Sequence, residues 1–245
     1  MAEIAPAVTP SASWGSGGEY GYSADLLQSA YGVTDFSGDG EIVAIVDAFD
    51  DPNAETFLNH YRTAQNNLGG CTTAGGCFTK INQQAGTSYP EYDPGWAGEI
   101  ELDLAAVSAI CPGCRILLVE ADSASGSDLY AAVQQAVQQG AKFVSMSWGG
   151  GESPSATTAD AAYFSAAKAP NVTFVASTGD CGFYDTAEDN IEYPAVSPDV
   201  VAAGGVTLSG AGPFSYTAWG HQHTDDHGDP VANASCWSLP WEGAG

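Results

Sequence analysis

Residues 96–110 read Trp-Ala-Gly-Glu-Ile-Glu-Leu-Asp-Leu-Ala-Ala-Val-Ser-Ala-Ile, and this stretch does most to decide the fold. Its apolar residues recur at the spacing of one helical face, at Ile100, Leu104, Val107 and Ile110. Glu99 and Asp103 are four residues apart, so they share a face of this helix and can touch, whereas Glu101 points elsewhere. The stretch therefore predicts a helix that carries a pair of contacting carboxyl groups.

Four short apolar runs surround this helix in the sequence and are typical of strands buried on both faces of a parallel sheet. They cover residues 42–47, 116–121, 142–147 and 172–177. Helical patterns at residues 53–65, 96–110, 127–139 and 156–169 alternate with them. The alternation predicts an α/β domain, a parallel sheet with helices on both faces and active residues at the ends of strands and helices.

The composition limits the partners of the chain. The 245 residues include 44% hydrophobic residues, enough for a sizeable core. Five Lys and Arg against thirty Asp and Glu leave a net charge of −25, which argues against nucleic acid and anionic membranes as partners. The acidity indicates either a solvated surface or adaptation to acid. No apolar run approaches the ~20 residues that cross a bilayer.

The ends of the sequence differ in composition from its middle. Residues 1–20 are rich in Pro, Ser and Gly and predict a flexible leader, without the basic start and apolar segment of a signal peptide. Residues 21–212 carry the strand and helix patterns and predict one domain. Residues 213–245 form a divergent tail.

Cysteine spacing indicates a compartment outside the cytosol. Cys71 and Cys77 bracket a Gly/Thr loop, and Cys111 and Cys114 bracket Pro-Gly after a helix, so each pair can close a local disulfide. A zinc site made of all four cysteines is the alternative. Cys181 and Cys236 are left, either paired with each other or with Cys181 free. The pattern favours a secreted, extracellular protein.

Several further motifs accompany the carboxyl pair. They are Tyr31-Gly32-Val33, the run from Ile45 to Pro52, Ser145-Met146-Ser147-Trp148-Gly149, Ser177-Thr178-Gly179-Asp180-Cys181-Gly182 and Glu192-Tyr193-Pro194-Ala195. From about residue 22 to about residue 207, the chain resembles the sedolisin, or serine-carboxyl peptidase, family. That family has a subtilisin-like fold and a Glu-Asp-Ser catalytic machinery.

The resemblance implies a role for each acidic residue. Glu99 would be the general base that takes the serine proton, Asp103 would hold and tune Glu99, and protonated Asp180 would donate a hydrogen bond to the oxyanion. Two carboxyl groups in contact cannot both ionise cheaply, so one keeps a proton and the pair works at acid pH.

Other residues acquire expected roles in the same way. In family members, both cysteine pairs resemble disulfides, which favours Cys71–Cys77 and Cys111–Cys114 over zinc. Asp47, Asp50 and Asp51 are expected to cap the following helix or to order its turn. The cleft that receives the peptide would be lined by Ser147, Trp148, Gly149 and Glu152, although an ordinary strand end explains the same residues.

The catalytic serine is missing from the sequence. In this superfamily it opens a helix in a Gly-Thr-Ser-x-x-x-Pro segment, and the chain contains no such segment. The nearest match, Gly86-Thr87-Ser88-Tyr89-Pro90, precedes the acid pair and is interpreted as a loop. The chain is therefore expected to be a C-terminally truncated subtilisin-like domain. It would lack the serine and the family's calcium loop, so no cofactor is expected in this chain and calcium only in the full domain.

The sequence thus predicts a serine-type acid endopeptidase of sedolisin type that is inactive as this chain. Its partners would be a peptide or protein substrate and the missing C-terminal portion. A non-catalytic protein that binds extended peptides is the first alternative. A metal-dependent hydrolase is a distant one, because His221-Gln222-His223-Thr224-Asp225-Asp226-His227 loosely resembles the zinc motif of the metallo-β-lactamase fold but is one residue too long.

Overall fold

The computed structural model describes residues 21–65, 68–151, 155–179 and 192–218, together with the backbone of 223–224 and 230–231. Its centre is a six-stranded sheet in the order β2-β3-β1-β4-β6-β8. All neighbouring strands in this sheet run parallel. The strands are β1 (Ile42–Ala48), β2 (Phe78–Asn82), β3 (Arg115–Ala121), β4 (Phe143–Met146), β6 (Thr173–Ser177) and β8 (Val200–Ala203).

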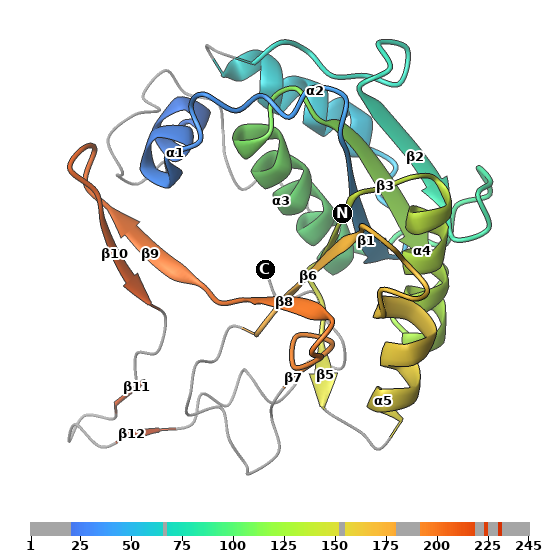
Figure 1. Ribbon diagram of the computed structural model, residues 1–245. Coiled ribbons are helices and arrows are strands. Elements are labelled where there is room, and N and C mark those ends of the chain that lie inside the picture. Colours follow the sequence, from blue (N-terminus) through green and yellow to red (C-terminus); the bar gives the residue numbers. More distant parts are fainter. Residues whose placement is uncertain are drawn as a thin grey trace.

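Helices cover both faces of this sheet (Figure 1). On one side lie α2 (Ala54–Ala64) and α3 (Pro94–Ile110), with α1 (Ala24–Tyr31) packed against α3. On the other side lie α4 (Gly126–Gln138) and α5 (Ala156–Ala159), which continues as the π-helix η1 (Asp160–Phe164). The predicted α/β sheet with helices on both faces is confirmed.

Alternation along each strand divides the core into two layers, because successive side chains in a strand point to opposite faces. In β1, Ala44 and Val46 pack in one cluster with α4, whereas Ile45 packs in the other with α2 and α3. All five residues from Ala44 to Ala48 are buried. Residues 43, 45 and 47 therefore belong to the face that α3 covers, and an acidic side chain at position 47 is buried beneath that helix.

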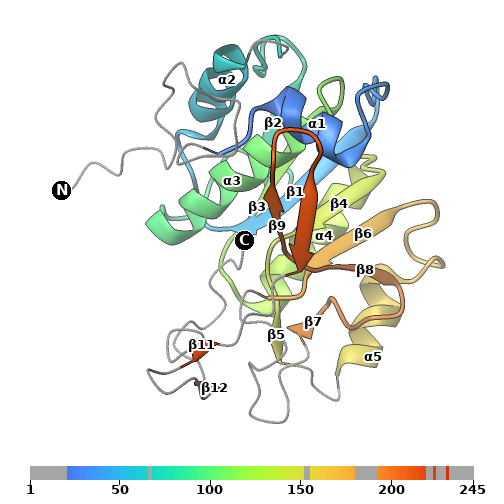
Figure 2. The ribbon, with the colours of Figure 1, turned by 90° about the vertical axis from the view of Figure 1, so that its left-hand side faces the viewer.

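The far edge of the sheet is much less covered. In β8, Val200 is half-buried while the other three residues are exposed, and Val201 keeps 53% of its surface. The chain then leaves the sheet as the antiparallel hairpin of β9 (Val206–Ser209) and β10 (Ser215–Ala218) (Figure 2). This hairpin is attached to α1, since the Tyr216 hydroxyl donates to the carbonyl of Ala30.

Two further short pairings join β5 (Gly150–Gly151) to β7 (Glu192–Tyr193) and β11 (His223–Thr224) to β12 (Pro230–Val231). The first lies directly after the candidate cleft motif. Of the predicted tail, residues 215–218, 223–224 and 230–231 form strands. The predicted leader, residues 1–20, lies outside the described residues.

Polar side chains fix the position of α3. At its start, Asp93 accepts hydrogen bonds from the backbone N–H groups of Gly95 and Trp96, and Pro94 occupies the first turn, where its missing N–H is not needed. Near its end, the buried Arg62 of α2 donates to the Ser108 hydroxyl at 2.9 Å. The same guanidinium donates to the carbonyls of Gly69 and Pro112, at 2.7 and 2.9 Å. The helix is thus held at both ends.

The sequence-based elements agree closely with the structure. The four predicted strands correspond to β1, β3, β4 and β6, and three predicted helices to α2, α3 and α4, each within two residues at either end. The helix predicted at 156–169 ends early, at Phe164, and turns then lead into β6. The strands β2 and β8, the helix α1 and the three small strand pairs were not predicted.

Both expected disulfides are present, Cys71–Cys77 and Cys111–Cys114, so their sulfurs are not available as zinc ligands. Cys181 and Cys236 lie outside the described residues. Within the described part of the chain, no helix is long and apolar enough to cross a membrane.

Candidate active site

The carboxyl groups of Glu99 and Asp103 lie on the buried face of α3. Their residues keep 7% and 8% of their surface, whereas Leu102 between them is 52% exposed. The helical spacing that the sequence indicated therefore places both acids against the sheet. Burial of two acids in one helix is unusual, since carboxyl groups lose hydration there and need partners.

Ser147, directly after β4, supplies one such partner. Its hydroxyl donates to Asp103 and lies 2.8 and 2.9 Å from the two carboxylate oxygens. Burial raises the pKa of Asp103 from its ordinary 3.8 to about 6, although the hydrogen bond from Ser147 acts in the opposite direction. Asp103 therefore titrates in the mildly acid range.

The other expected cleft residues behave differently from one another. Trp148 is fully buried, its indole N–H donates to the carbonyl of Val46 at 2.7 Å, and its side chain offers nothing for a peptide to contact. Gly149 lies against the carboxylate of Glu192, and a Cβ atom at this position would collide with it. Glu152, the fourth residue, lies outside the described residues.

Asp47 at the end of β1 corrects an expectation. Its side chain is fully buried, and among the described residues neither carboxylate oxygen has a hydrogen-bond partner, so Asp47 does not cap the following helix. Burial, reinforced by the nearby charges of Asp103, Glu99 and Glu120, raises its pKa well above the usual range. The turn is ordered instead by Asp51, whose carboxylate accepts from the N–H of Asn53 at 2.8 Å.

Glu120 on β3 extends the group of buried acids. It lies in register with Asp47, so both side chains point to the face that α3 covers. Its carboxylate accepts from the backbone N–H of Asp51 at 3.0 Å and pairs with the ammonium of Lys80 at 2.9 Å. Burial raises the pKa of Glu120 to about 8 in spite of these hydrogen bonds.

Lys80 on β2 is the cation of this neighbourhood. Besides Glu120, it pairs with Asp50 and donates to the carbonyl of Asp51 at 2.6 Å. Burial lowers the pKa of Lys80, but the hydrogen bonds with Asp50 and Glu120 outweigh that effect and raise it. Besides Asp51, four acids are buried in the described part of the chain, and we call these four the carboxyl cluster: Asp47, Glu99, Asp103 and Glu120.

Sequence reasoning found half of this cluster. It missed Asp47 and Glu120 as site residues, although each stands inside an apolar run at a position that a buried strand normally gives to Val, Ile or Leu. An acid in such a run was the available signal. Asp180, the expected oxyanion donor, lies outside the described residues.

Ser88 is in a loop between β2 and α3, as interpreted from the sequence, where its carbonyl accepts from the side chain of Asn82 at 2.9 Å. The structure thus gives no sign of a catalytic role for this serine.

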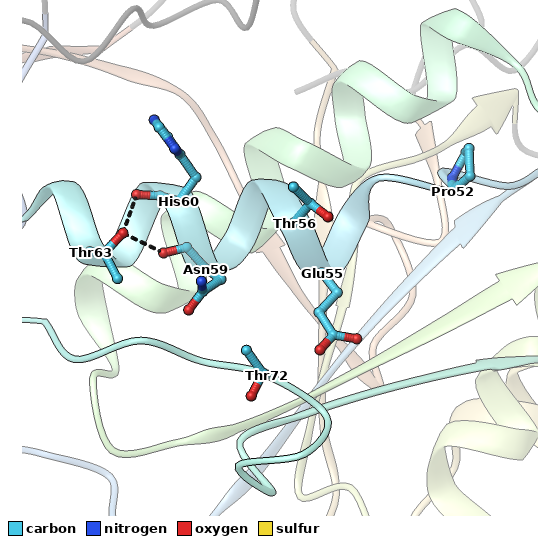
Figure 3. Close-up of a pocket in the computed structure, with 7 residues that line it drawn as sticks. All are labelled: Pro52, Glu55, Thr56, Asn59, His60, Thr63 and Thr72. Carbon is cyan, nitrogen blue, oxygen red and sulfur yellow. Dashed lines mark hydrogen bonds between the residues drawn. The ribbon is translucent and has the colours of Figure 1, made fainter.

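A cavity of about 490 Å³ lies elsewhere, along the outer surface of α2 (Figure 3). Its lining is mostly polar and comes from α2 and the loop at Thr72, with no member of the carboxyl cluster: Pro52, Glu55, Thr56, Asn59, His60, Thr63 and Thr72. Glu55 is engaged there by the N–H and hydroxyl of Thr73. The cavity is separate from the acid chemistry.

The described ranges contain no group of three or more His, Cys, Asp or Glu residues suited to hold a metal ion.

With this parallel sheet between helices and this buried acid pair, the chain matches the subtilase family of peptidases over residues 36–234. It belongs to that family. Within it the chain is similar to the sedolisins: it is 31% identical over 197 residues to kumamolisin from Bacillus sp. (strain MN-32) and 31% identical over 191 residues to sedolisin from Pseudomonas sp. (strain 101).

These alignments cover 75% and 69% of this chain, but only 34% and 32% of the two relatives. The chain therefore spans about a third of their length. The solved structure of Pseudomonas sedolisin, described as a serine-carboxyl proteinase complexed with two molecules of pseudo-iodotyrostatin, superposes with a TM-score of 0.67 at 27% identity. That match covers 84% of this chain and 60% of the sedolisin chain, and it supports a sedolisin-like, subtilisin-like peptidase fold.

Proposed function

We propose that this chain supplies the acid–base part of a serine-type endopeptidase that works at acid pH. In this proposal Glu99 is the general base, Asp103 holds and tunes it, and Asp180 donates a hydrogen bond to the oxyanion. The observation that carries the proposal is the burial of Glu99 and Asp103 together on one helix face, with Ser147 bonded to Asp103. The similarity to sedolisins supports it.

The chemistry follows from the carboxyl cluster. A general base must be unprotonated when it accepts the hydroxyl proton of a nucleophile, and its conjugate acid must then be able to return that proton to the leaving amine. Neighbouring carboxyl groups satisfy both needs near their own pKa values, because protonation of one favours ionisation of the next. With Asp103 titrating at about 6, the working range is acid.

The nucleophile is proposed to come from polypeptide outside this sequence, because the family's Gly-Thr-Ser-x-x-x-Pro segment does not occur in it. The chain alone is therefore expected not to cleave peptides. We further propose secretion, since its two disulfides are typical of oxidising compartments. Calcium binding would need residues beyond those described.

The test is peptide hydrolysis by the purified chain between acid and neutral pH, with a mixture of unstructured peptides as substrate and Glu99→Gln as the matched control. The expected result is no turnover in either protein. Turnover by the native chain that Glu99→Gln abolishes would show that another serine serves as nucleophile, and Ser88→Ala would then identify or exclude the nearest candidate. Reading the coding sequence beyond Gly245 for the missing segment tests the source of the nucleophile.

The competing function is peptide binding without catalysis, with an extended peptide lying against the segment from Ser145 to Gly149. The contacts of Ser147 and Trp148 weigh against it, because both side chains are engaged inside the protein. A saturable affinity for peptides together with no hydrolysis, even after the serine segment is supplied, would favour this alternative.

A further inference from the structure

We propose that Ser147 is a positioning residue that decides which acid of the carboxyl cluster ionises first as the pH rises, by stabilising the charged form of Asp103 while Asp47 stays neutral. The proposal deepens the function proposed above and rests on it, because Asp103 can tune Glu99 only in a defined protonation state. The proposal concerns which acid holds a proton. Ser147 would act on the proposed base Glu99 through Asp103, without touching a substrate.

The hydrogen bond itself indicates the state of Asp103. The hydroxyl of Ser147 lies at nearly equal distances, 2.8 and 2.9 Å, from both oxygens of the acid. An ionised carboxylate has two equivalent acceptors and suits one shared donor, whereas a protonated acid would have to donate from one oxygen to the Ser147 hydroxyl and could accept from it only at the other. The geometry thus matches a charged Asp103.

Asp47 has the opposite surroundings. It is fully buried, and among the described residues its two oxygens accept no hydrogen bond. The titratable groups that face it are all acids: Glu99 and Asp103 from α3, and Glu120 from β3. Lys80 pairs with Glu120 and Asp50. A charge on Asp47 would therefore be buried without a donor and beside other acids, which is costly, so the proton belongs here.

The donor is held in place by its neighbour in the sequence. Trp148 is fully buried and tied by its indole N–H to the carbonyl of Val46, so the backbone at position 147 cannot easily move away from α3. Val46 directly precedes Asp47 in β1. Trp148 therefore links β1, which carries the neutral Asp47, to Ser147, which stabilises the charge on Asp103.

Removing the Ser147 hydroxyl should make Asp103 hold its proton more tightly. A hydrogen bond to the charged form of an acid lowers its pKa, and loss of a charge-assisted bond worth roughly 1.5 kcal/mol corresponds to about one pH unit. In Ser147→Ala the pKa of Asp103 is expected to rise by about that amount. Ser147→Thr keeps the hydroxyl and should retain the native value.

The experiment is a carbon-13 NMR titration of the side-chain carboxyl groups in the aspartate-labelled chain, with Asp103→Asn used to assign the signal of Asp103. Ser145→Ala is the matched control, since it removes a hydroxyl two residues away on the same strand face. The expected result is a higher midpoint for Asp103 in Ser147→Ala only. An unchanged midpoint in folded Ser147→Ala would overturn the proposal.

Circular dichroism at each pH checks that the variants fold. If Ser147→Ala does not, the isosteric pair Ser147→Thr and Ser147→Val makes the same comparison. Loss of folding in both hydroxyl-free variants, with Ser147→Thr native, would mean that the hydroxyl serves folding rather than proton placement, and would also overturn the proposal. The titration needs no turnover, so a failed peptidase assay and a failed proton assignment are separate results.

Discussion

The two halves of the central sheet contrast sharply in how they are covered. The strand β1 lies between β3 and β4, with α3 on one face and α4 on the other, and its residues from Ala44 to Ala48 are buried. The strand β8 belongs to the same sheet, yet Val201 is 53% exposed and two alanines beside it are also exposed. The same kind of sequence, a run of Val and Ala, forms a core strand in one half and an exposed edge in the other.

The positions of the acids in the carboxyl cluster therefore do not depend on the exposed edge of the sheet. The cluster lies in the covered half, where β1, β3 and α3 position its four acids without help from β8. The exposed half is where further polypeptide would find apolar surface to bury. At ~25 cal/mol per Å² of apolar surface, covering even a few hundred Å² there would stabilise the chain by several kcal/mol.

The largest effect is expected from matched substitutions in the two halves. Val46→Asp buries a charge in the core and should cost more than about 4 kcal/mol, which prevents cooperative folding. Val201→Asp should change stability by about 0.5 kcal/mol or less and should reduce binding of a hydrophobic dye. Thermal melting and dye fluorescence measure both. A monodisperse native chain that binds no dye would show that the β8 edge is covered, which would remove the contrast.

The next largest effect is the pH dependence of stability, which should come from Asp103 in the covered half of the sheet. The folded chain holds protons on Asp103 at pH values where the unfolded chain has lost them, since its pKa is raised from 3.8 to about 6. Stability from this group is therefore complete below about pH 4 and is lost as the pH rises through about 6, a change on the order of 3 kcal/mol. Melting temperatures measured from pH 3 to pH 8 should fall accordingly. Asp103→Asn should flatten the profile, and an equally steep fall in that variant would contradict the assignment.

The disulfides should have a smaller effect. Replacing Cys71 and Cys77 by alanine opens a loop of sequence separation 6 and removes a constraint on the unfolded chain worth about 2 kcal/mol. The matched replacement of Cys111 and Cys114, with separation 3, should cost less. Urea denaturation of the two double variants measures the difference. The reverse order would mean that native contacts, rather than loop closure, decide the stabilisation.

The smallest effect is expected at the start of α3. Asp93→Ala removes the acceptor for two backbone N–H groups and should cost about 1 kcal/mol, whereas Asp93→Asn, which keeps an acceptor, should cost much less. Denaturation of the two variants at pH 5 measures this. A loss of several kcal/mol in Asp93→Ala would show that α3 depends on its cap more than on its packing.

The sequence predicted the covered half of the molecule well. Strands such as Ile42–Ala48 and the helix with Ile100 and Leu104 have strong apolar patterns, because both faces or one whole face of each is buried. The strands β8 to β10 were not predicted, since their mostly exposed residues leave no alternation to detect. Within the site, the Glu99 and Asp103 pair was visible as a spacing. The contribution of Asp47 depends on strand register, which single-sequence patterns do not reveal.

The hydrogen bonds of Arg62 hold parts of the fold together in a way that does not depend on pH in the acid range. Its three hydrogen bonds go to two carbonyls and one hydroxyl, groups that carry no proton to gain or lose across the acid range. An arginine that held the same loops through carboxylates would release them as those carboxylates became protonated. Arg62 connects α2 to the end of α3 and to the loops at Gly69 and Pro112. These contacts should therefore keep their geometry at the low pH that suits the carboxyl cluster.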